Sequence, residues 1–305
     1  AYQLGGQAVL HFSYGHFFQM PPMYAMYQNN SFLVDPNNFV TRMGNTLLEP
    51  EKTITYEIGL WQELNQVMAL DVALFYRDIY NLLTTKTIST YNQVKYGLYS
   101  NKDYGNVRGL ELKLDLAMGQ LKGMVNYTLQ YTRGNADSPG QTFDRAGNNQ
   151  DPVNRLIPMG WDQRHTLNGS LIYGTEKYGG SMTAYYNSGS PYTFAPQSES
   201  VLSRINLYPN NDYRPEKYSV DCSFYYRFKL PGGYNANLDV NIYNLFDRLN
   251  EEWVNDQTGR AYTAVIKETD IAGHRSDFND YEDRIKNPSM YSSPRMVKIG
   301  IGVNF

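Results

Sequence analysis

The sequence has 305 residues, a formal net charge of −3 and a single cysteine, Cys222. The near-zero charge gives no case for nucleic acid as a partner, and one cysteine excludes an internal disulfide framework and a multi-cysteine metal site. No segment approaches the roughly 20 apolar residues that a helix needs to span a bilayer. Residues 1–15 lack the charged region and continuous apolar core of a signal peptide, so we expect a removed leader or a start inside a longer protein.

Alternation of apolar and polar side chains predicts β-strands along the whole chain. In the last of them, Val297, Ile299 and Ile301 fall on one face, and Lys298 and Gly300 on the other. A period of two is typical of a strand with one apolar and one polar face. The pattern predicts ten strands, at 7–15, 53–63, 68–76, 110–116, 125–131, 164–173, 180–187, 218–228, 236–242 and 295–305.

The connections between these strands alternate between short and long. Long excursions are expected around 79–103, 134–162, 190–215 and 247–293, with tight turns between them. Outer-membrane barrels have short periplasmic turns and long extracellular loops. The sequence therefore predicts an all-β fold, a transmembrane antiparallel β-barrel whose last strand descends to the periplasm.

A soluble antiparallel sheet with one solvated face would also alternate. Two features make it the weaker alternative. Large apolar residues continue to the strand ends, and aromatic residues collect there, as in the interfacial girdles of a barrel. Examples are Tyr14 with Phe17, Tyr56 with Trp61, Tyr76 with Tyr80, and Tyr243 with Phe246.

Several segments resemble the C-terminal part of TonB-dependent outer-membrane receptors. NTLLEPEKT at 45–53, running into TYEIG at 55–59, is similar to the family's entry into a barrel strand. Pro50 suits a strand entrance because it cannot donate to a ladder. Glu57 and Gly59 are expected on the lumen side, where a glycine leaves room. Further resembling segments are FYRDIYNL at 75–82, YGNVRGLEL at 104–112, WDQRHTL at 161–167, SGSPY at 188–192 and NIYNLFD at 241–247.

The resemblance implies a barrel of about 22 strands closed by an N-terminal plug. No plug and no TonB box is recognised in this sequence, so residues 1–305 are expected to be the C-terminal portion of the barrel. The ten strands would then form an open curved sheet when considered alone.

The resemblance also implies a function and a set of partners. The whole protein would capture a scarce ligand at the cell surface and import it with TonB energy, without enzymatic activity or a cofactor. The implied partners are outer-membrane lipid, the protein's own plug and remaining strands, the TonB complex reached through the plug, and the barrel assembly machinery. A surface lipoprotein is an optional further partner. The terminal Phe305 fits the insertion signal that the assembly machinery recognises.

One predicted outward loop is rich in aromatic residues and methionine, which could hold a ligand by contact area and ring stacking. The preferred alternative is that these residues form the outer girdle and fold the loop against the barrel mouth. The candidate ligand-binding residues are Phe17, Phe18, Met20, Met23, Tyr24 and Tyr27.

The last long loop is acidic near its end and could hold calcium through carboxylate oxygens. A solvated acidic loop is preferred, because the turn glycine of an EF-hand loop is missing. The residues concerned are Asp277, Asp280, Glu282 and Asp283.

A complete ten-stranded barrel acting as a passive porin or a surface enzyme is the alternative function. The pairs Asp162–His165 and His274–Asp277 are candidate catalytic groups, but neither comes with a recognisable nucleophile. The sequence does not distinguish iron chelates, cobalamin, glycans and peptides as ligands. The loop arginines that could select an anion, Arg133, Arg145 and Arg155, are dispersed.

Overall fold

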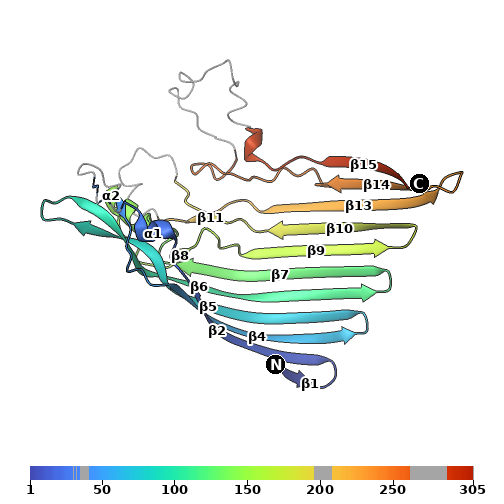
Figure 1. The fold of residues 1–305 in the computed structure, drawn as a ribbon, viewed down its shortest axis with the longest axis horizontal. Helices are drawn as coiled ribbons and strands as arrows, with labels where there is room; N and C mark the ends of the chain where they lie inside the picture. The colour runs from blue at the N-terminus through green and yellow to red at the C-terminus, as the bar shows by residue number, and fades with distance from the viewer. Residues whose placement is uncertain (30, 32, 35–40, 196–207, 262–286, 305) are drawn as a thin grey trace, which may run out of the picture.

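The computed structural model describes residues 1–29, 31, 33–34, 41–195, 208–261 and 287–304. Its core is one 13-stranded sheet in which the main strands follow one another in chain order (Figure 1). These strands are β1 (Tyr2–Leu4), β2 (Ala8–Gln19), β4 (Glu51–Asn65), β5 (Met68–Ser89), β6 (Lys95–Met118), β7 (Leu121–Gly134), β9 (His165–Gly174), β10 (Tyr178–Asn187), β13 (Lys217–Lys229), β14 (Asn235–Tyr243) and β15 (Met296–Asn304).

All neighbouring pairs along this path are antiparallel, and within the described residues β15 does not pair with β1. The all-β prediction is therefore confirmed, and so are the ten strands and the open sheet. The short β1, which pairs with the start of β2, is a strand that the alternation did not reveal.

The strand register separates the sheet into an apolar and a polar face. One row of paired residues is apolar or aromatic across eight strands: Leu10, Leu60, Val72, Leu112, Tyr127, Leu167, Tyr186 and Tyr218. The adjacent row on the opposite face is mostly polar: His11, Gly59, Ala73, Glu111, Thr128, Thr166, Asn187 and Lys217. The apolar face is open, with Ile299 69% and Ile301 74% exposed. An apolar band of this extent fits contact with lipid.

Glu57 and Gly59 lie on the polar face, as the sequence predicted. Gly59 pairs with His11, whose ring lies over it, and a Cβ at Gly59 would stand 2.2 Å from that ring. The His11 Nε2 atom is 3.3 Å from the Asp71 carboxylate. The glycine thus makes room for a neighbouring imidazole on the polar face.

Long and short connections lie at opposite ends of the sheet. In Figure 1 the tight turns and the C-terminus are at the right, whereas the helices α1 (Met23–Tyr27) and α2 (Gln141–Gly147) lie at the left with the long loops. The small strands of these loops are β3 (Arg42–Met43), β8 (Ile157–Pro158), β11 (Pro191–Tyr192) and β12 (Asp212–Tyr213), and a 3-10 helix covers Pro288–Met290. Among the described residues, no helix has the length and hydropathy needed to cross a membrane.

The prediction of a loop at 79–103 is wrong. The strands β5 and β6 continue as a hairpin past a register shift at Ile79–Leu83 and turn only at 90–94. Asn81 adopts a φ of 60° at this irregularity, which is a β-bulge. The bulge interrupts the alternation, and the polar residues that follow it look like a loop in the sequence.

Candidate functional site

The extension of β5 and β6 is the platform on which the loops at this end of the sheet are built. The side chains of Ala25 and Leu48 pack on it against Leu83 and Tyr99, and all four are buried. Met26 packs against the same cluster. Helix α1 is therefore held by its inward residues, since a helix of one and a half turns is not stable by itself.

The outward residues of α1 stay accessible. Tyr24 makes an edge-to-face contact with Tyr99, with ring centroids 5.8 Å apart, yet remains 53% exposed. Met23 is 74% exposed and Tyr27 is 54% exposed. The structure thus brings Met23, Tyr24 and Tyr27 together on one short helix, which we call the α1 segment.

The other three predicted ligand-binding residues do not join them. Phe17 and Phe18 are consecutive residues of β2, so they point to opposite faces of the sheet. Phe18 shares the apolar face with Tyr14, and the Lys52 ammonium lies 6.0 Å from its ring centroid. That position suits an interfacial girdle rather than a ligand site. Met20 is exposed and follows the end of β2.

The second helix fixes the other side of the platform. Phe143 of α2 is fully buried, and a Cβ at Gly97 of β6 would stand 3.3 Å from its ring. Arg42 donates two hydrogen bonds to the Asp144 carboxylate, at 2.6 and 2.8 Å. The hydrogen bonds from Arg42 to Asp144 raise the pKa of the Arg42 guanidinium. These contacts join α2 to β6 and to Arg42, although the three segments are far apart in the chain.

A buried carboxylate, Asp103, lies in the extension and is 6% exposed. Burial raises the pKa of Asp103, although hydrogen bonds from Thr84 and Asn135 and the charge of Lys102 oppose the shift. The folded-state pKa is above the unfolded value, so this residue's stabilising contribution is present at low pH. It is lost as the pH rises through the folded-state pKa.

We therefore expect Asp103→Asn to make the folded protein more stable at neutral pH and to flatten the fall in stability as the pH rises above about 4, the ordinary pKa of an aspartate. The amide keeps an oxygen that accepts the hydrogen bond from Asn135, 2.9 Å away in the native protein. Thermal unfolding of the detergent-solubilised receptor across this pH range measures the effect. The exposed Asp151→Asn is the control, and a variant less stable than wild type at pH 7 would refute the assignment.

The candidate catalytic pair Asp162–His165 is not a pair in the structure. The Asp162 carboxylate is fully buried and accepts hydrogen bonds from the Thr132 backbone N–H at 2.7 Å and from Arg164 at 3.1 Å. It also accepts one from the Tyr213 hydroxyl at 3.2 Å. His165 pairs instead with the Tyr127 hydroxyl, 2.9 Å from its Nδ1 atom.

Asp162 therefore fastens the loop between β8 and β9 to the end of β7 and to β12. The sequence did not reveal Arg164 and Tyr213 as its partners, because Tyr213 is brought there by a separate long loop. The Arg164 guanidinium also lies 4.0 Å from the ring centroid of Tyr131.

The remaining predicted residues lie outside the described residues. These are His274, Asp277, Asp280, Glu282, Asp283 and Phe305. Among the residues that the structure does describe, no group of three or more His, Cys, Asp or Glu side chains could hold a metal ion.

Known proteins share this fold. FpvA of P. aeruginosa, solved with ferric pyoverdine, is 15% identical with a TM-score of 0.56, over 98% of this chain and 31% of that one. Fiu, the ferric-catecholate import receptor of E. coli K12, is 20% identical with a TM-score of 0.53, over 85% of this chain and 31% of Fiu. The E. coli outer membrane transporter YddB is 11% identical with a TM-score of 0.55, over 80% of this chain and 35% of YddB. The chain thus spans about a third of the solved structures it resembles.

No curated protein matches the sequence. A family model described as "TonB dependent receptor-like, beta-barrel" matches residues 1–245, which include every strand from β1 to β14. Strand order, the two faces of the sheet and this match agree, and the chain belongs to the family of TonB-dependent receptor β-barrels.

Proposed function

We propose that this chain is the C-terminal wall of an outer-membrane receptor that captures a scarce ligand at the cell surface and imports it with TonB energy. The observation that carries the proposal is the combination of a lipid-compatible apolar face with the described parts of the long loops at one end of the sheet. The N-terminal plug and the remaining strands would come from sequence beyond residues 1–305. Family membership is consistent with the absence of enzymatic activity.

The proposed orientation places the tight turns and the C-terminus in the periplasm and the α1 segment outside the cell. Outer-membrane barrels have their short turns on the periplasmic side, which supports this choice. The barrel assembly machinery would recognise the terminal Phe305, the TonB complex would act through the plug, and a surface lipoprotein is an optional partner.

The α1 segment is the proposed point of ligand contact. Its rings and thioether are exposed, while the helix beneath them is fixed by Ala25 and Tyr99. Aromatic side chains on a fixed support bind with little loss of conformational entropy. Fiu is described as a ferric-catecholate import receptor, and FpvA was solved as a complex with pyoverdine and iron, so ferric siderophores are the first probes to use.

We expect Met23→Ser with Tyr27→Ala to lower the uptake of the transported chelate by about fivefold or more, the size of a lost contact at the centre of an interface. Uptake of ⁵⁵Fe-labelled ferric catecholates and ferric pyoverdines by cells that make the full-length receptor measures this. Tyr91→Ala, at the fully exposed tip of the β5–β6 hairpin, is the matched control. Unchanged uptake in the double variant would remove the α1 segment from the ligand site.

The same assay separates a receptor from a porin. A receptor takes up its ligand only in tonB⁺ cells, and the purified full-length protein should give no steady current in a planar bilayer. Ligand uptake that persists without TonB, together with a steady ion current, would establish the porin instead.

A further inference from the structure

A row of tyrosines crosses the apolar face near the long-loop end of the sheet, and one position in the row is an arginine. In register across β2, β4, β5, β6 and β7, the paired residues are Tyr14, Tyr56, Tyr76, Arg108 and Tyr131. Each lies four residues along its strand from the apolar row that includes Leu10 and Leu112, so all five side chains leave the sheet on the apolar face. Ring centroids are 5.1 Å apart between Tyr14 and Tyr56, and 6.3 Å apart between Tyr56 and Tyr76. We call these five residues the tyrosine row.

The tyrosine row lies where the boundary of the hydrocarbon is expected. Strand β6 continues for ten residues from Arg108 to its end at Met118. That length is about 34 Å along the strand, and a tilt of about 45° reduces it to about 24 Å along the membrane normal. The apolar band of an outer-membrane barrel is about 25 Å tall and ends in aromatic girdles. Arg108 therefore stands at the level of the lipid head groups, toward the end of the sheet that carries the long loops.

A second arginine follows in the next row toward the loops. Arg133 lies opposite Asn106 on β6, two residues from Arg108. Because Arg108 lies opposite Tyr131, the two arginines are diagonal neighbours on one face of the sheet. Diagonal neighbours are about 7–8 Å apart, a spacing that long side chains can bridge. Both arginines are exposed, and the Arg108 guanidinium lies 6.0 Å from the Tyr131 ring centroid.

The protein does not neutralise these two charges. Within the described part of the chain, no carboxylate oxygen lies within 4.0 Å of the Arg108 or the Arg133 guanidinium. An acidic side chain on the same face, Asp78, is engaged elsewhere. Its Oδ1 atom accepts hydrogen bonds from the Tyr76 hydroxyl at 3.1 Å and from the Asn106 amide at 3.2 Å. Two guanidinium groups are thus left without a counter-charge on a face that fits contact with lipid.

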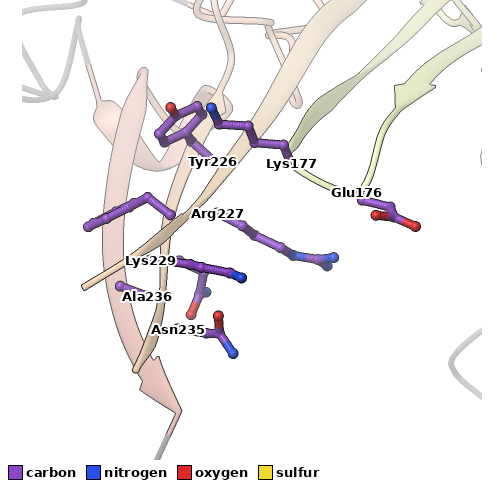
Figure 2. A pocket seen from close by; sticks show the side chains of 9 residues that line it. Glu176, Lys177, Tyr226, Arg227, Lys229, Asn235 and Ala236 are labelled. Carbon is purple, nitrogen blue, oxygen red and sulfur yellow. The ribbon is translucent and has the colours of Figure 1, made fainter. Parts of the chain in front are cut away.

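The cations at the tight-turn end of the sheet are arranged differently. An open cleft of about 1010 Å³ there is lined by Lys177, Arg227 and Lys229 (Figure 2). The Lys177 ammonium lies 5.6 Å from the ring centroid of Tyr226, on the apolar face, whereas Arg227 leaves β13 on the polar face. In Figure 2 the end of Arg227 extends away from Lys177 and Tyr226. These cations do not converge on one group, in contrast to the diagonal pair on β6 and β7.

We propose that Arg108 and Arg133 bind a phosphate group of lipid A in the outer leaflet. Guanidinium groups suit this role because they bind phosphate oxygens through two parallel hydrogen bonds. Leu110 and Leu129 are paired in the row on the membrane side of Arg108, and they offer the acyl chains an apolar surface. The inference rests on the orientation in the proposed function, because lipid A forms the outer leaflet of the outer membrane and glycerophospholipid forms the periplasmic one.

Native mass spectrometry of the full-length receptor in detergent, titrated with monophosphoryl lipid A, tests the proposal. Each cation near a charged lipid surface is worth about fivefold in affinity, so Arg108→Gln and Arg133→Gln should each weaken binding by that factor and the pair by about twenty-five-fold. Arg227→Gln is the matched control, because Arg227 is also exposed and its guanidinium lies 5.0 Å from the Tyr225 ring centroid, but on the polar face. Thermal unfolding checks that each variant is folded.

Equal affinity of the double variant and wild type would overturn the site. Binding of dioleoyl phosphatidylglycerol that is as tight as that of lipid A and depends on the same arginines would overturn lipid A as the ligand. Displacement of the lipid by inorganic phosphate at the same concentration would also overturn it, by making free phosphate the ligand. Uptake by the double variant should equal that of wild type, so a failure of the transport proposal is seen separately.

Discussion

Replacing Gly189 with alanine is expected to destabilise the folded receptor by about 3 kcal/mol or more, the upper range for overpacking. A Cβ at this position would stand 1.5 Å from the Arg214 carbonyl oxygen, which is backbone and cannot rotate away. The flanking chain is also fixed, since the Ser190 carbonyl oxygen accepts from the Arg214 N–H at 3.0 Å and the Ser188 hydroxyl accepts from the His165 N–H at 2.9 Å.

Thermal unfolding of the detergent-solubilised full-length protein measures this effect. Gly169→Ala is the matched control, because it lies in a strand and a Cβ there has no atom within 4 Å. An unfolding temperature for Gly189→Ala equal to that of the control would mean that the backbones of Gly189 and Arg214 do not approach each other as closely as described.

Replacing Asp162 with alanine should lower the free energy of unfolding by about 3–5 kcal/mol, which is the usual cost of removing one partner from a buried ion pair. The Thr132 N–H loses its acceptor, and the Arg164 guanidinium, whose side chain is 23% exposed, loses its counter-charge. Tyr213 loses the same carboxylate and keeps the hydrogen bond from Arg164, so β12 is held less firmly to the loop between β8 and β9.

Hydrogen exchange gives the local readout. The Thr132 amide should exchange much faster in Asp162→Ala, whereas amides in the middle of β13 should keep their protection. The exposed Asp151→Ala serves as the control. Unchanged protection at Thr132 would show that the buried carboxylate does not fasten the loop. Asp162 would then need a role other than a structural one.

The sequence predicted the membrane-facing strands well because lipid on one side and a polar lumen on the other impose a strict period of two. It failed at the β5–β6 extension, where other segments of the chain cover the hairpin. There the burial comes from Ala25, Leu48 and Phe143, which reach the hairpin from other loops. Such contacts between distant segments leave no period in the local sequence.

The structure explains why one of the segments that resemble the receptor family has its particular residues. Asn244 and Asp247 in the NIYNLFD segment both adopt a φ of 53°, which favours asparagine and aspartate among residues with a side chain. The Asn244 amide donates to the Ser293 carbonyl oxygen at 3.0 Å, and the Asp247 carboxylate accepts from the Arg295 N–H at 2.7 Å. This turn therefore directs the chain into β15.

The candidate site was only partly predictable, because contacts between distant segments of the chain determine which of its residues come together. Composition identified an aromatic, methionine-rich loop, and three of its residues do share the α1 segment. Whether a given ring would face lipid, solvent or a neighbouring strand depended on where β2 ends and on the platform beneath the helix. The alternation within β2 could have separated Phe17 from Phe18, because consecutive strand residues point to opposite faces.

The central claim is that this chain is an outer-membrane wall with its long loops outside the cell, and cysteine labelling at the two ends of β6 tests it most directly. Tyr91→Cys and Gln120→Cys, each in a Cys222→Ser background of the full-length receptor, place one thiol at the hairpin tip and one at the β6–β7 turn. A membrane-impermeant maleimide should label Tyr91→Cys on intact cells and Gln120→Cys only after the outer membrane is permeabilised. Labelling of Gln120→Cys but not Tyr91→Cys on intact cells would contradict the orientation, and equal labelling of both would contradict a membrane-spanning wall.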